Sequence, residues 1–130
     1  MSVLARFRKE SPFEARDIAR EIEVKLIRLC MNEKYIPKRY RFTIAQSLIE
    51  ATEKMSDCVT VANSLPRNAP EREKNQRYAY AMCEVIMRKL DLAERLGFSI
   101  PEGTMVELIK TLDKEQKAIQ GWIAADHKSV

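Results

Sequence analysis

Apolar side chains recur at three- and four-residue spacing in four stretches of the chain, and short segments with proline, glycine and polar residues separate these stretches. Such spacing places the apolar residues on one face of an α-helix. It predicts helices over about residues 12–35, from between 37 and 43 to about 64, over about 70–96, and over about 101–125. The four stripes are formed by Ala15, Ile18, Ala19, Ile22, Leu26, Leu29 and Cys30; Ile44, Leu48, Ala51, Met55, Cys58 and Ala62; Ala79, Met82, Cys83, Ile86, Leu90 and Ala93; and Met105, Leu108, Ile109, Leu112, Ile119, Trp122 and Ile123.

Capping and turn residues mark the helix boundaries. Three segments combine a polar capping residue, a proline suited to the first turn and a glutamate three residues after the cap: Ser11-Pro12-Phe13-Glu14, Asn68-Ala69-Pro70-Glu71 and Ser99-Ile100-Pro101-Glu102. Leu65-Pro66 ends the second helix, because a residue before proline disfavours the helical conformation. Gly97 is typical of the position that follows a helix C-terminus.

The connections between the predicted helices are short, so helices that are neighbours in sequence must run in opposite directions. The predicted fold is all-α, an antiparallel up-down-up-down four-helix bundle over residues 12–126. A flexible basic arm over residues 1–11 precedes it, and a tail over residues 127–130 follows it. A chain of 130 residues is long enough for one hydrophobic core.

Further apolar residues lie outside the four stripes. They are Val24, Ile27, Met31, Ile49, Val59, Val61, Tyr80, Val85 and Met87. Large exposed apolar patches are rare on monomers, so we expect a side-by-side homo-oligomer. The alternative is a broad core face that buries most of these residues within one bundle.

The composition is mildly basic, with a net charge of +4 and an isoelectric point near 9.0, which favours anionic partners without requiring one. No apolar run approaches the roughly 18 residues that cross a bilayer, and the first residues lack the apolar stretch of a secretory signal. We therefore expect a cytoplasmic protein with no membrane association. Cys30, Cys58 and Cys83 form an odd set, which predicts reduced, buried thiols and no disulfide framework.

The segment between the first two predicted helices combines cations with aromatic rings. Its cations are Lys38, Arg39 and Arg41, and its rings are Tyr35, Tyr40 and Phe42. Cations release counterions when they contact phosphates, and flat rings can stack on unpaired bases, so this loop is a candidate nucleic-acid-binding site. In the alternative interpretation the rings seal the end of the bundle and the charges stay solvated.

Other cations are expected at the opposite end of the bundle, together with the chain termini. They are Arg67, Arg72, Lys74 and Arg77 around the start of the third helix, and Arg6, Arg8 and Lys9 in the arm. Basic residues at both ends suggest that a nucleic acid lies along one bundle or across several. Charged loops that are only solvated remain the alternative.

The sequence offers little to a catalytic mechanism. His127 is the only histidine and falls in the predicted tail, which argues against histidine acid–base catalysis and against most zinc or di-iron sites. Motifs of the phosphate-binding-loop, Gly-x-Ser-x-Gly and Cys-x-x-Cys types are missing from the sequence. We expect no cofactor, no metal and no catalytic residue. The enzymatic alternative would rest on carboxylates close to apolar faces, such as Glu50 and Glu84.

The capped first helix, the Ile36-Pro37-Lys38-Arg39-Tyr40-Arg41-Phe42 connection and the closing Ile119-Gln120-Gly121-Trp122-Ile123-Ala124 resemble the accessory variability determinant (Avd) proteins of diversity-generating retroelements. The resemblance covers about residues 10–126. Avd proteins belong to a wider four-helix-bundle family with the proteins encoded in 23S ribosomal RNA intervening sequences. Those relatives carry Ser-Asn-Ile-Ala-Glu-Gly where this chain reads Val59-Thr60-Val61-Ala62-Asn63, and this difference favours the Avd branch.

The resemblance implies a non-enzymatic partner of a reverse transcriptase. Such a protein is a basic, barrel-shaped pentamer that binds the enzyme and structured template RNA, and possibly DNA, to support mutagenic reverse transcription. Two alternatives remain open at the level of the sequence. One is a bundle of the ribosomal intervening-sequence type, and the other is a helical protein-interaction module with no nucleic-acid role.

Overall fold

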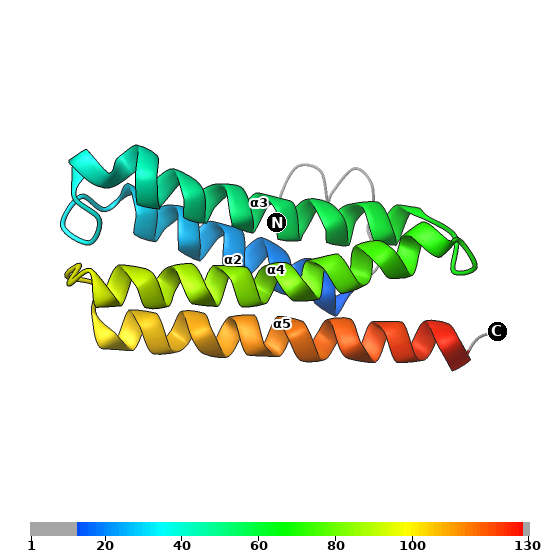
Figure 1. The fold of residues 1–130 in the computed structure, drawn as a ribbon. Helices are drawn as coiled ribbons and strands as arrows, with labels where there is room; N and C mark the ends of the chain where they lie inside the picture. Colours follow the sequence, from blue (N-terminus) through cyan, green and yellow to red (C-terminus); the bar gives the residue numbers. More distant parts are fainter. Residues whose placement is uncertain (1–12, 129–130) are drawn as a thin grey trace, which may run out of the picture.

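The computed structural model describes residues 13–128, and all regular secondary structure in that range is helical (Figure 1). Four long helices form a bundle, and two short helical segments lead into the second of them. The elements are α2 (Glu14–Met31), η1 (Lys38–Tyr40), η2 (Arg41–Ala45), α3 (Gln46–Ser64), α4 (Pro70–Arg95) and α5 (Glu102–Lys128). The predicted all-helical class and the number of long helices are confirmed for residues 13–128.

Helix α2 begins at Glu14, after an extended Phe13 whose carbonyl accepts a hydrogen bond from the Asp17 N–H (3.1 Å). The carboxylates of Glu14 and Asp17 in the first turn suit the positive end of the helix dipole. The predicted capping residue Ser11 lies outside the described residues.

The helix ends at Met31, four residues before the predicted end at about Tyr35. The turn at Asn32 is the reason. Its carbonyl accepts hydrogen bonds from the N–H groups of Tyr35 and Ile36, and its side-chain oxygen accepts one from the Lys34 N–H (3.0 Å). An asparagine that bonds the backbone two residues onward stabilises a turn in place of further helix.

Helix α3 begins at Gln46, three residues after the predicted window of 37–43, because one turn of 3₁₀-helix and one turn of π-helix, which both begin within that window, precede it. The π-helical turn spans Arg41–Ala45 and holds an N–H···O=C bond from Gln46 to Arg41. A π-helical turn accommodates one extra residue and changes the direction of the side chains around it. Here Ala45 faces the core while Arg41 and Phe42 face outward. The helix ends at Ser64, before Leu65 and Pro66, as predicted.

Helix α4 begins with Pro70 in its first turn, but its N-cap is Ala69 and no side chain caps it. The predicted capping role of Asn68 is therefore wrong. At the other end of α4, Gly97 adopts a left-handed conformation (φ 80°) that favours glycine. Its N–H bonds the Glu94 carbonyl (3.0 Å), which closes the helix as predicted.

Helix α5 begins at Glu102, and the Pro101 carbonyl accepts a hydrogen bond from the Met105 N–H (3.1 Å). The helix continues to Lys128, whereas the sequence pattern predicted a tail from residue 127. The buried carboxylate of Asp126 explains the difference, because it anchors the last turn to α4. None of the described helices is long and apolar enough to span a lipid bilayer.

The core runs along the bundle axis and consists of residues from all four long helices. Side chains without solvent exposure include Ile22, Leu26, Leu48, Met55, Ile86, Leu90, Leu112 and Ile119. The sequence pattern assigned Val59 and Ile109 to the wrong side of the core boundary. Val59 is buried, because it lies four residues after Met55 on the same face, and Ile109 is 38% exposed, because it lies one residue beyond that face.

The remaining apolar residues outside the stripes divide into two groups. Val24, Met31 and Val61 are exposed. The others lie at intermediate depth, where a broad core face covers part of each side chain: Ile27, Ile49, Tyr80, Val85 and Met87.

The two ends of the bundle hold the cations that the sequence analysis singled out. The connections after α2 and after α4 lie at one end, which we call the loop end (residues 32–45 and 96–101) (Figure 1). The ring of Tyr40 packs on that of Phe98 there, with centroids 5.0 Å apart. The corner end consists of the α3–α4 connection (residues 65–69), the first turns of α4 and the last turns of α5, which meet through Arg72 and Asp126.

Candidate nucleic-acid interface

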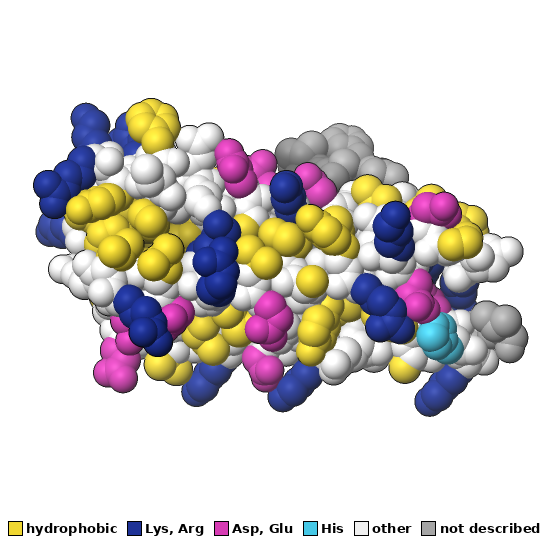
Figure 2. Space-filling view, viewed as in Figure 1, with side chains coloured by type: hydrophobic (Ala, Val, Ile, Leu, Met, Phe, Trp, Pro, Cys, Tyr) yellow, Lys and Arg dark blue, Asp and Glu magenta, His cyan; other side chains and the backbone are white. Residues whose placement is uncertain are grey.

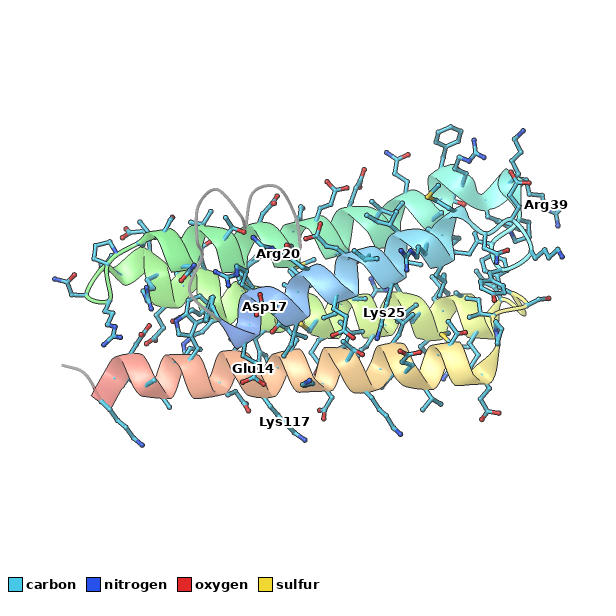
Figure 3. The ribbon with its side chains drawn as sticks, turned by 180° about the vertical axis from the view of Figure 1, so that it is seen from behind. Glu14, Asp17, Arg20, Lys25, Arg39 and Lys117 are labelled. Atoms are coloured by element: carbon cyan, nitrogen blue, oxygen red, sulfur yellow. The ribbon has the colours of Figure 1, made fainter. Side chains whose placement is uncertain are left out.

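The loop end carries three exposed cations within four residues, Lys38, Arg39 and Arg41. Figure 2 shows Lys and Arg side chains gathered at this end of the molecule, and in Figure 3 Arg39 points away from the helices. The Arg39 guanidinium lies over the Tyr40 ring at 5.0 Å from its centroid, and Arg41 forms a loose ion pair with Glu33 (3.6 Å). The short helical turns of η1 and η2 present all three charges to solvent on one rim.

The three predicted stacking residues differ in how much of each ring is free. Tyr35 and Tyr40 are half-buried against the core, and Tyr40 also packs on Phe98. Phe42 is 79% exposed, the most exposed of the large apolar side chains within residues 13–128. Two of the rings therefore pack against the end of the bundle, as the second interpretation of the loop expected, while Phe42 projects into solvent beside the cations; nucleic-acid binding by this loop stays a prediction.

Arg72 occupies a buried site at the corner end, with only 9% of its surface exposed. Its guanidinium donates a two-pronged hydrogen bond to the Asp126 carboxylate, from Nε to Oδ2 at 2.7 Å and from Nη2 to Oδ1 at 3.0 Å. Its Nη1 donates to the carbonyl of Leu65 (2.8 Å), where α3 ends, and its guanidinium lies 5.2 Å from the Trp122 ring centroid. The prediction that Arg72 contacts phosphate is therefore wrong, because these groups already occupy its donors.

The Asp126 carboxylate is the centre of this corner cluster. It accepts a third hydrogen bond from the Gln76 side chain (2.9 Å), and Arg67 lies 3.9 Å away on the solvent side. Burial alone would raise the pKa of Asp126. The hydrogen bonds from Arg72 and Gln76 and the charges of Arg72 and Arg67 outweigh it and hold the pKa of this carboxyl below its usual range.

The remaining corner-end cations are exposed. Arg67 and Lys74 lie at the surface, and Arg77 pairs with Glu73 one turn earlier on α4 (3.0 Å). The same Glu73 contacts the ring of His127, and hydrogen bonds from His127 and then Arg77 lower the pKa of the Glu73 carboxyl. Exposed pairs of this kind are worth little, so Arg77 can exchange its partner for a phosphate at small cost.

The arm residues Arg6, Arg8 and Lys9, predicted as phosphate contacts, lie outside the described residues. The predicted phosphate contacts that remain exposed within residues 13–128 therefore fall into two groups. Lys38, Arg39 and Arg41 form one group at the loop end. The exposed residues Arg67, Lys74 and Arg77 form the other at the corner end.

One carboxyl group inside the bundle was missed by the sequence prediction. Glu115 on α5 has no exposed surface, and neither side-chain oxygen has a hydrogen-bond partner. Burial, with the nearby charge of Glu14 on α2 as a smaller cause, raises the pKa of Glu115 to about 8. By contrast Glu50 and Glu84, the carboxylates behind the enzymatic alternative, are both exposed and accept hydrogen bonds from glutamine side chains.

Asp126 was also missed by the sequence prediction, although the sequence pattern contained a signal for it and for Glu115. Glu115 lies three residues after Leu112 and four before Ile119, so it falls on the buried stripe of α5. Asp126 lies four residues after Trp122 and therefore on the same face as that ring.

The cysteines are free, as predicted, but only Cys83 is fully buried, while Cys30 and Cys58 lie at intermediate depth. Burial raises the pKa of the Cys30 thiol to about 12 and also raises that of Cys83, so neither is poised as a thiolate. No group of three or more histidine, cysteine, aspartate or glutamate side chains within residues 13–128 is arranged to hold a metal ion.

Comparison with known proteins adds no assignment. The chain matches no protein-family model and no curated protein.

Proposed function

We propose that this protein binds RNA through the loop end and performs no chemistry on it. The observation that supports this best is the exposure of three neighbouring cations beside an exposed aromatic ring, Phe42, on one rim of a helical bundle. Cations position phosphates, and an exposed ring stacks on an unpaired base. The exposed cations of the corner end extend the contact as secondary phosphate sites.

In its cellular setting the protein acts as an accessory factor of a diversity-generating retroelement, in the cytoplasm. It binds the reverse transcriptase together with the template RNA or its cDNA during mutagenic reverse transcription. The support is the resemblance of the first helix, the loop and the end of α5 to Avd proteins. The neighbouring genes test this. We expect the gene to lie beside a reverse-transcriptase gene with paired template and variable repeats.

The same resemblance supports an antiparallel up-down-up-down bundle that assembles into a pentamer. Self-association would cover exposed apolar side chains, which each of the four long helices contributes: Val24, Met31, Val61, Leu92, Val106 and Ile109. Light scattering coupled to gel filtration measures the state directly. A monomer at micromolar concentration would contradict the assembly.

A salt series tests RNA binding. The variant K38Q/R39Q/R41Q removes the three loop-end charges, and we expect the slope of log affinity against log salt to fall by about two units for single-stranded RNA. The matched control, K110Q/K114Q/K117Q, removes three exposed cations from α5 and should leave the slope within one unit of the wild type. Equal effects of the two variants would mean that only net charge matters.

The competing function is a protein-interaction module whose charge serves solubility. The exposed apolar residues on α4 and α5 are the specific observation in its favour. This alternative gains support if the purified protein binds reverse transcriptase with unchanged affinity after K38Q/R39Q/R41Q and shows no affinity for RNA at low salt.

A further inference from the structure

A hollow of about 450 Å³ opens beside the loop-end cations. Its apolar lining comes from the end of α2, the connection after it, the π-helical turn and the start of α3. These residues include Met31, Ile36, Phe42, Ala45 and Ile49. Pockets of 300 to 1,000 Å³ with an apolar lining and a few polar groups are typical of small-ligand sites.

The π-helical turn builds this hollow. It points Phe42 outward on one side and turns the small side chain of Ala45 inward, where only 4% of its surface is exposed. The Ala45 carbonyl accepts a weak hydrogen bond from the Cys30 thiol (3.6 Å), which ties the turn to α2. π-Helical turns are frequent at functional sites because they place side chains where a regular helix does not.

The polar part of the lining has a net charge of +1, from Lys38 and Arg41 against Glu33. Arg41 and Glu33 are 3.6 Å apart and both are more than half exposed, so their pairing is weak and each can engage a ligand. The site therefore combines an apolar floor, an exposed ring, two cations for phosphate and one carboxylate that accepts hydrogen bonds.

We propose that the hollow receives a single unpaired nucleotide of the bound RNA. This inference rests on the proposed RNA-binding function. The base lies against Phe42 and the apolar floor, and its phosphates contact Lys38 and Arg41. Glu33 accepts hydrogen bonds from an amino group of the base, which favours adenine, guanine or cytosine over uracil. A paired base cannot enter, because it is stacked within its duplex.

The test compares Phe42→Ala with Phe42→Trp, neither of which alters charge, by titration of short single-stranded RNA and of an RNA duplex. We expect Phe42→Ala to weaken binding of single-stranded RNA roughly tenfold and to leave duplex binding unchanged, while Phe42→Trp restores wild-type affinity. Because Phe42 is exposed, neither substitution disturbs the core. Replacement of Glu33 by leucine, which removes both acceptor oxygens, should abolish the preference for an adenosine, guanosine or cytidine over a uridine at one position of the single strand.

Other outcomes separate this inference from the function on which it rests. If Phe42→Ala leaves the affinity for single-stranded and for duplex RNA unchanged while K38Q/R39Q/R41Q still weakens binding, the hollow takes no base and RNA binds through the loop-end cations alone. If Phe42→Ala changes the oligomeric state and not RNA affinity, the hollow is a protein contact and the inference is overturned. If wild-type protein binds neither RNA at low salt, the proposed function itself fails.

Discussion

The two ends of the bundle have similar residue types but place their cations differently. Each brings a cluster of arginine and lysine residues to a connection between helices, near an aromatic residue. At the loop end the three cations remain exposed and Phe42 projects beside them. At the corner end Arg72 is buried against Trp122 and paired with Asp126.

The difference lies in the availability of a buried carboxylate. Asp126 reaches Arg72 from a helix that is distant in sequence, and the guanidinium also satisfies carbonyl groups where α3 ends. No such carboxylate meets the loop-end cations within residues 13–128, where Glu33 makes only the loose pair with Arg41. An arginine in a basic run thus serves stability where a buried carboxylate faces it and remains available for ligands elsewhere.

Replacement of Asp126 by asparagine should produce the largest effect on stability. It leaves the Arg72 charge buried without its counter-charge, and we expect a loss of about 3 to 5 kcal/mol in the free energy of unfolding. Chemical denaturation at neutral pH measures it. Arg67→Gln, which touches only the exposed side of the same carboxylate, is the control and should cost less than about 1 kcal/mol.

The same pair makes the corner end sensitive to acid. The pKa of Asp126 in the folded state lies below its ordinary value of 3.8. The pair with Arg72 therefore stabilises the fold fully above pH 3.8, and this stabilisation is lost as the pH falls through the folded-state pKa. Wild-type protein should lose stability in this acid window, and D126N should not. Equal acid sensitivity in both proteins would show that other carboxylates dominate.

Glu115, midway between the two ends, should respond to pH in the opposite direction. Its pKa rises from 4.5 to about 8 on folding, so the folded state holds a proton that the unfolded chain releases, and stability declines as pH rises between these values. We expect Glu115→Gln to remove this decline and to gain up to about 4 kcal/mol relative to wild type between pH 4.5 and pH 7.5. A difference between the two proteins that is constant from pH 4.5 to 8 would contradict a buried, protonated carboxyl.

At the loop end, Gly97→Ala should have a smaller effect on stability. The residue has φ 80°, and an added Cβ would meet no atom within 4 Å, so the cost is conformational and amounts to about 1 kcal/mol. Thermal unfolding measures it, and Gly121→Ala in the middle of α5 is the control, since there alanine favours the helix. A gain in stability for Gly97→Ala would mean that the left-handed turn is not retained.

The smallest stability effect is expected for K38Q/R39Q/R41Q. The three replaced side chains are exposed, so the free energy of unfolding should change by no more than about 0.5 kcal/mol while the affinity for RNA falls. A large loss of stability would instead give these cations a structural role like that of Arg72. Urea unfolding and RNA titration of the same preparation decide between the two.

Much of the fold was predictable from the sequence because the apolar stripes lie at regular spacing. Residues such as Ile22, Met55 and Leu90 are buried as their positions in those stripes require. Boundaries were less predictable where local hydrogen bonds competed with the helix, as at Asn32.

The candidate site was predictable only in part. The exposure of Phe42 depends on a π-helical turn, and the burial of Arg72 depends on a carboxylate 54 residues away. The first is a local change of backbone hydrogen bonding and the second a contact between helices, and the spacing of apolar residues along a helix reveals neither. Glu115 was visible in the pattern, since it interrupts an apolar stripe with an acid.

Hydrogen–deuterium exchange with and without saturating single-stranded RNA tests the central claim most directly. Our account predicts slower exchange of the backbone amides of residues 38–45 in the presence of RNA, with weaker protection around residues 67–77 and none in the middle of α5. Saturated binding that leaves the amides of residues 38–45 unchanged would contradict it.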